Sequence, residues 1–141
     1  TVHGGYVYVA DGSGLRIYNK ADFLSAADGD SVKSVGRFKT STEDDKLRVS
    51  FTHAEGDKIY VGEFYRAENY ETPDSHKYKT AAGDENTALI LAYSFDDSAP
   101  LGISDKVERA YSIRGLVQGL CFDAQGRIYL STSYAVAFSH I

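Results

Sequence analysis

Cysteine, proline, methionine and tryptophan are scarce in this 141-residue chain, which has one Cys, two Pro and neither Met nor Trp. The single thiol, Cys121, excludes an internal disulfide, a dithiol redox motif and a zinc site built from several cysteines. No stretch approaches the roughly 20 apolar residues of a membrane-spanning helix, so we expect no membrane span. Positive charge is also scarce, with 15 Lys and Arg against 20 Asp and Glu. The net negative charge gives the chain no electrostatic reason to bind nucleic acid.

The familiar signatures of nucleotide and cofactor chemistry are missing too. The chain has no P-loop and no Gly-x-Ser-x-Gly elbow, and its four histidines show no His-x-x-x-His spacing. We therefore expect no cofactor, with calcium as the one open possibility.

Tyrosine and glycine are abundant instead, with 11 and 13 copies, a mixture that favours short strands joined by tight turns. Three segments share a frame of turn, β-branched residue, tyrosine, aliphatic, small and polar residue: 5–11, 57–63 and 126–132. Further strand-like segments precede or follow the copies. The sequence therefore predicts an all-β fold of antiparallel strands in repeated four-stranded units.

Repeated units of four short antiparallel strands are typical of β-propeller blades. We expect one partial propeller domain over 1–141, with blades at about 1–40, 47–115 and 116–141, the last of them incomplete. Closed propellers use about four to eight blades, so these blades form an incomplete ring. An open arc exposes apolar faces and strand edges. We expect either a fragment or a ring that another copy, or the missing part of the same protein, completes.

Several segments also carry a family resemblance: 58–65, 70–76, 88–93, 117–123, 128–134 and the step His3-Gly4-Gly5. Together they resemble the C-terminal part of a group of uncharacterised, secreted bacterial proteins with a β-propeller-like fold. The resemblance implies a propeller and export, with the signal segment absent from this chain. It supplies no catalytic residues.

The residue three positions after the frame tyrosine is polar in each copy, namely Asp11, Glu63 and Thr132. If the frame strands line a channel, these oxygens form a ring at its mouth. Such a ring suits calcium, which takes several oxygen ligands at about 2.3–2.6 Å. The alternative is that each residue simply ends its strand.

Two matching segments, 62–65 and 131–134, are the candidate binding site. They place a carboxylate, hydroxyls and tyrosines at equivalent positions, and the residues that we expect to bind are Glu63, Tyr65, Ser131, Thr132, Ser133 and Tyr134. Hydrogen bonding under an aromatic face suits a sugar or a peptide. Packing of the tyrosines between blades is the simpler alternative.

The polar stretch 66–84 is typical of a long exposed loop, and it contains Asp74, Ser75 and His76, the residue types of a hydrolytic triad. Adjacent residues do not give the geometry of a triad, so we expect His76 to be solvated. Cys121 lies between Leu120 and Phe122 on a predicted strand, and we expect it to be buried.

These features favour an exported recognition module for an extracellular polymer or protein. The alternative is a propeller-based hydrolase or lyase with its site at the channel mouth, where Glu63 and His76 are the candidate catalytic residues. A third possibility is a structural role in which the open edges serve for assembly.

Overall fold

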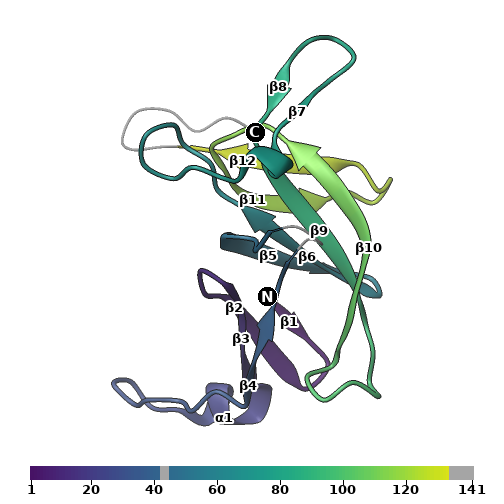
Figure 1. The fold of residues 1–141 in the computed structure, drawn as a ribbon. Coiled ribbons are helices and arrows are strands. Elements are labelled where there is room, and N and C mark those ends of the chain that lie inside the picture. The colour runs from purple at the N-terminus through teal and green to yellow at the C-terminus, as the bar shows by residue number, and fades with distance from the viewer. Residues whose placement is uncertain (42–44, 134–141) are drawn as a thin grey trace.

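The computed structural model describes residues 1–41 and 45–133, and nearly all of its regular structure is antiparallel sheet (Figure 1). The first sheet contains, in spatial order, β1 (Val2–His3), β2 (Tyr6–Ala10), β3 (Gly14–Asn19) and β4 (Gly36–Lys39). The second sheet contains β5 (Val49–Glu55), β6 (Lys58–Glu63), β9 (Ala88–Phe95) and β10 (Ile103–Ile113). Two hairpins are formed by β7 (Tyr78–Lys79) with β8 (Glu85–Asn86) and by β11 (Val117–Phe122) with β12 (Ile128–Thr132).

The prediction of an all-β fold is confirmed, and the frame copies at 5–11, 57–63 and 126–132 fall on β2, β6 and β12. In both four-stranded sheets, spatial order follows chain order, so each sheet is an antiparallel meander. The described residues form no closed ring.

The second sheet is covered on both faces, which explains the continuous apolar run of β6 and β9. Side chains of a strand alternate between faces. Ile59 and Val61 face the first sheet in one core cluster, while Tyr60 lies in a second cluster that includes residues of β11 and β12. The first sheet, the second sheet and the β11–β12 hairpin are therefore packed in series, and β5 contacts both β2 and β11 (Figure 1).

The frame strands β2, β6 and β12 are each the second strand of their unit. Of these, β6 lies inside its sheet between β5 and β9 and does not line an open channel. The premise behind the ring of Asp11, Glu63 and Thr132 is therefore wrong for β6, whose residues from Ile59 to Glu63 are all buried.

The third copy of the frame is much more exposed than the second. Ile59 and Tyr60 of β6 are 0% and 8% exposed, whereas their counterparts Ile128 and Tyr129 are 39% and 38% exposed. Cys121, the cross-strand partner of Tyr129, is exposed as well. Its predicted burial is wrong because only the alternate residues of β11 face the second sheet.

The helical content is small. Helix α1 (Lys20–Ser25) is capped by Asn19, whose side chain accepts hydrogen bonds from the backbone N–H groups of Ala21 and Asp22. The 3₁₀ turn η1 (Asp74–His76) lies in the long connection between β6 and β9. Among the described residues, no helix is long and apolar enough to cross a membrane.

Because the second frame copy is buried and the third is exposed, equivalent substitutions in the two copies should change the free energy of unfolding by different amounts. Ile59→Ala should lower the free energy of unfolding by about 2–5 kcal/mol, because it empties a buried site. Ile128→Ala should cost less than about 1 kcal/mol in the chain alone, since that side chain is already partly in water. Urea unfolding of both variants measures the difference, and equal losses would contradict the exposure of the third copy.

Two buried tyrosines predict a loss of stability at high pH. Burial raises the pKa of Tyr8 and of Tyr93 to about 12, whereas an unfolded tyrosine titrates near about 10. The folded state therefore keeps these protons to higher pH, so the stabilisation is complete below about pH 10 and is lost as the pH rises towards 12. Urea midpoints should fall across this range, and Tyr8→Phe with Tyr93→Phe should flatten the fall. Tyr78→Phe, at an exposed site, is the control that should leave it unchanged.

Candidate functional site

A buried carboxylate marks the end of β6. Glu63 is 0% exposed, and its carboxylate accepts hydrogen bonds from the backbone N–H groups of Arg48, at 3.1 Å, and Leu89, at 3.2 Å. Nδ1 of His76, which is 1% exposed, lies 3.1 Å and 3.0 Å from the two carboxylate oxygens. Because a carboxylate only accepts, Nδ1 carries the proton in this hydrogen bond.

The structure thus brings together the two residues of the enzyme alternative, but it places both of them inside the protein. The expectation of a solvated His76 is wrong, since η1 turns the imidazole inward onto Glu63. At these exposures neither side chain reaches the surface, and their contact links the end of β6 to the connection that precedes β9.

The neighbours of His76 do not complete a triad. The Ser75 hydroxyl donates to Oδ2 of Asp45 at 2.7 Å, and Asp74 pairs with Lys77 at 2.8 Å. The hydrogen bond from Lys77 lowers the pKa of Asp74. Asp74, Ser75 and His76 therefore point to three different partners.

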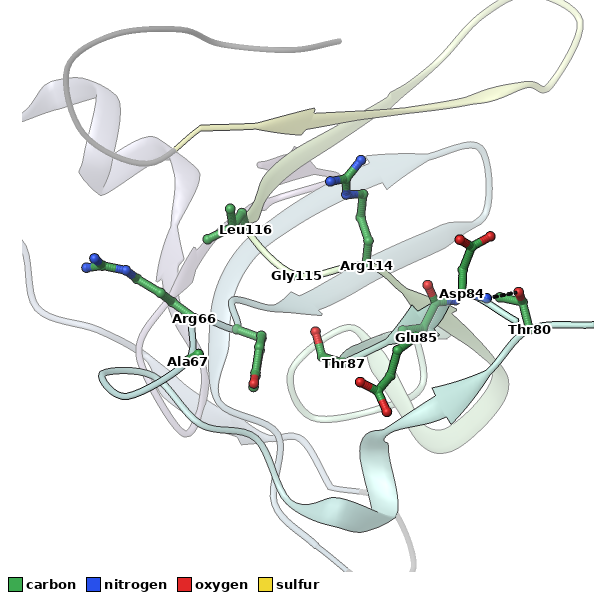
Figure 2. A pocket seen from close by; sticks show the side chains of 11 residues that line it. Arg66, Ala67, Thr80, Asp84, Glu85, Thr87, Arg114, Gly115 and Leu116 are labelled. Atoms are coloured by element: carbon green, nitrogen blue, oxygen red, sulfur yellow. Dashed lines mark hydrogen bonds between the residues drawn. The ribbon is translucent and has the colours of Figure 1, made fainter. Parts of the chain in front are cut away.

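The main cleft has a volume of about 900 Å³ and opens where three chain segments meet (Figure 2). Its lining comprises Thr80 and the segments 65–67 after β6, 84–87 around β8, and 114–116 between β10 and β11. Backbone hydrogen bonds tie the segments together, from Leu116 N–H to Tyr65 C=O at 2.9 Å and from Thr87 N–H to Ile113 C=O at 3.0 Å. Of the predicted binding residues, Tyr65 lines this cleft.

Unusual backbone conformations border the main cleft. Leu116 and Glu68 have φ values of 67° and 71° and are the non-glycine residues of the described chain with positive φ. Gly115 approaches the neighbouring segments so closely that an added Cβ would lie 2.8 Å from Cδ1 of Tyr65 and 3.0 Å from Oγ1 of Thr87. Such conformations persist where the surroundings enforce them, and they concentrate at functional sites.

A small cleft of about 380 Å³ lies beside Phe64, the residue that follows β6. It is lined by Ser50, Phe64, Tyr70 and Gln118. The Ser133 hydroxyl donates to Oε1 of Gln118 at 3.0 Å, so the small cleft connects the two segments that the sequence paired as a binding site. The guanidinium of Arg48 lies 5.8 Å from the Tyr70 ring centre.

The remaining predicted residues are distributed differently. Thr132 pairs with Val117 across the β11–β12 hairpin, and Ser131 with Gly119. Tyr134 lies outside the described residues.

The candidate calcium ligands have other partners. Asp11 forms ion pairs with Arg16 at 2.7 Å and Arg37 at 3.3 Å, and the hydrogen bond from Arg16 lowers the pKa of its carboxyl group. Glu63 is engaged by His76 and by backbone donors. Within 1–41 and 45–133, no group of three or more His, Cys, Asp or Glu side chains could hold a metal ion.

Sequence reasoning missed most of the main cleft. The aperiodic insert before β9 was a signal for one wall of it, because long loops in compact domains are often functional. The opposite wall, 114–116, joins two predicted strands and carries no signal of its own.

Comparison with family models, with curated proteins and with solved structures found no match.

A double-mutant cycle tests the role of the buried pair. Glu63→Ala should lower the free energy of unfolding by about 3–5 kcal/mol, because it leaves His76 and two backbone donors buried without their acceptor. Adding His76→Ala should cost less than the sum of the single losses, since the two side chains are in contact. Chemical denaturation measures all three variants.

Glu55→Ala is the matched control. Its partner is His53 at 3.4 Å, and its side chain is 52% exposed, so removal should change stability by less than about 1 kcal/mol. Additive losses at Glu63 and His76, or a loss no larger than the control's, would show that the pair does not hold the connection.

Proposed function

We propose that this chain is an arc of an exported, propeller-type recognition module that binds an extracellular polymer or protein. Two features of the fold support a propeller-type arrangement: four-stranded antiparallel meanders that recur along the chain, and the packing of successive sheets face to face in series. Export is proposed from the sequence resemblance alone.

The observation that carries the recognition proposal is the construction of the main cleft. Its walls come from connections between strands, where binding residues gather, and backbone hydrogen bonds tie 114–116 to 65–67 and 84–87 to the end of β10. The buried Glu63–His76 pair anchors the long connection that supplies most of the lining. A site held in place before the ligand arrives loses less conformational entropy on binding.

The burial of Glu63 and His76 favours recognition over catalysis. The hydrolase or lyase alternative requires Glu63 and His76 to reach a substrate, and these are among the least exposed side chains of the described chain. The main cleft offers an aromatic ring, amide and hydroxyl groups and charges of both signs, which suit binding.

We further propose that the β11–β12 unit is completed by strands from another copy or from the rest of the same protein. The support comes from within the chain. In the other two units, the frame strand is paired on both sides and its tyrosine is buried, whereas in the described part of the third unit β12 is paired only with β11 and Tyr129 is exposed. A third strand beside β12 would repeat the arrangement of the first two sheets.

Binding to a defined panel tests the recognition proposal. The folded chain is immobilised and exposed to neutral, acidic and amino polysaccharides and to purified extracellular proteins, with affinities measured by interferometry. Tyr65→Ala should weaken any binding by about tenfold or more, because an aromatic contact in a cleft contributes roughly 1–3 kcal/mol.

Phe23→Ala is the matched aromatic control, since Phe23 is 44% exposed and lies on α1, at the other end of the molecule from β7 and β8 (Figure 1). It should leave the affinity unchanged, and thermal melting verifies that both variants fold. Absence of binding across the panel, or equal effects of the two substitutions, would refute recognition at the main cleft.

A further inference from the structure

The frame strands meet in the same way at both places where successive units pack together. Tyr8 of β2 lies in one core cluster with Ile59 and Val61, the residues on either side of the next frame tyrosine. Tyr60 of β6 lies in the second cluster, against which Leu130 of β12 packs. At both places, therefore, the tyrosine of one frame copy faces the aliphatic residues of the next copy.

At the last unit of the series, the tyrosine half of this contact is uncovered. Tyr8 and Tyr60 are buried, but Tyr129 is exposed, and no unit follows it within 1–41 and 45–133. Its cross-strand partner Cys121, which lies on the same face of the hairpin, is exposed as well. We call Tyr129 and Cys121 the Tyr129 face.

At the first unit, the aliphatic half of the contact is uncovered. Val9 of β2 occupies the frame position of Val61, yet Val9 is 40% exposed and Val61 is 0% exposed. Val2 of β1 is exposed too, and it lies on the same face because it pairs with Val7. Helix α1 contacts β2 and β3 but leaves Val2 and Val9 exposed. We call Val2 and Val9 the Val9 face.

The polar groups beside both faces already have partners within the chain. Arg16, the cross-strand partner of Val9, forms an ion pair with Asp11 at 2.7 Å. The Tyr129 hydroxyl donates to Oδ2 of Asp123 at 3.1 Å. Covering the two faces therefore leaves neither Arg16 nor the Tyr129 hydroxyl without a partner, which would be the costly outcome.

We propose that two copies of this chain dock reciprocally, with the Tyr129 face of each copy against the Val9 face of the other. The two faces lie at opposite ends of the series of sheets (Figure 1). They are the two halves of a contact that the chain forms twice within itself, so a second copy supplies both missing halves at once.

Reciprocal docking also agrees with the number of units. Two copies of a chain with three units supply six, which lies within the range of about four to eight blades in closed propellers. The inference rests on the propeller-type arrangement proposed above and names a second copy as the partner. It concerns the faces of the sheets and is separate from the strand that we propose beside β12.

Other arrangements of two copies would not involve both faces. If two hairpins met through their Tyr129 faces, or two chains met along the free edge of β12, Val9 would stay exposed and its substitution would have no effect. Contact between unlike faces makes Val9 and Tyr129 equally necessary.

Sedimentation velocity of the full chain over a range of concentrations tests the docking. The unaltered chain should reach twice the mass of one copy. Val9→Lys and Tyr129→Glu should each weaken the association by at least about tenfold, because each places an unpaired charge in both contacts.

Mixing the two variants tests which faces meet. A mixed pair has one unaltered contact, and its other contact places the introduced lysine opposite the introduced glutamate, so mixing should restore the doubled mass. Val107→Lys and Tyr78→Glu are the matched controls, because these residues are 40% and 51% exposed and lie outside both faces. Neither control should alter the association, and thermal melts verify that all four variants fold.

The thiol of Cys121 reports the same contact independently. Its reaction with a maleimide should slow at concentrations at which the chain associates, and it should stay fast in Tyr129→Glu at those concentrations. A thiol that reacts equally fast in the associated chain would show that the Tyr129 face is not covered.

The outcomes separate this inference from the recognition proposal, since the main cleft is lined by neither face. A chain that stays single, an association that Val9→Lys does not weaken, or one that mixing does not restore would overturn reciprocal docking. If the chain stays single while the panel binds and Tyr65→Ala weakens that binding, recognition stands and the second copy is wrong. If the chain associates as expected and nothing in the panel binds, docking is supported and recognition at the main cleft fails.

Discussion

The carboxylate of Glu63 is the constraint on which the rest of the site depends. A buried carboxylate is tolerated only where donors surround it, and here the donors come from the start of β5, the start of β9 and the 3₁₀ turn η1. One side chain thus fixes where the long insert leaves the second sheet and where it returns. Phe64 and Tyr65 follow directly, one lining each cleft. The geometry of both clefts therefore depends on the Glu63 carboxylate, although this group lines neither cleft.

The second sheet explains how such a site is supported. Its central strands are buried on both faces, so β6 and β9 are held by two core clusters as well as by their ladder hydrogen bonds. Burial on both faces makes displacement costly, because any shift disturbs close packing on two sides. The ends of β6 and β9 are consequently rigid points, and the connections that leave them carry the polar and aromatic side chains of the clefts.

The strands of this fold are predictable from the sequence, because the tyrosine frame and its flanking turns report local alternation and turn chemistry. The place of Tyr65 near a binding cleft is also predictable, since this residue follows a frame copy. The burial of His76 was not, because it depends on a carboxylate 13 residues away that a turn of the insert brings close. The burial predicted for Cys121 is wrong for a related reason. Alternation shows that β11 has two faces, but only the packing decides which face is covered. Arg114 and Glu85 come to line one cleft only through the pairing of three connections, which no local pattern encodes.

The β11–β12 hairpin packs against the second sheet through one face, with Leu120, Phe122 and Leu130 beside the second core cluster. Local opening free energies are lowest where buried contacts are fewest, so the backbone amides of this hairpin should exchange with solvent before those of β6 and β9. Gln118, which belongs to the hairpin, forms one wall of the small cleft, while Phe64 opposite belongs to the anchored segment. The two walls of the small cleft therefore differ in support, since one follows the buried Glu63 and the other belongs to a hairpin that packs through one face.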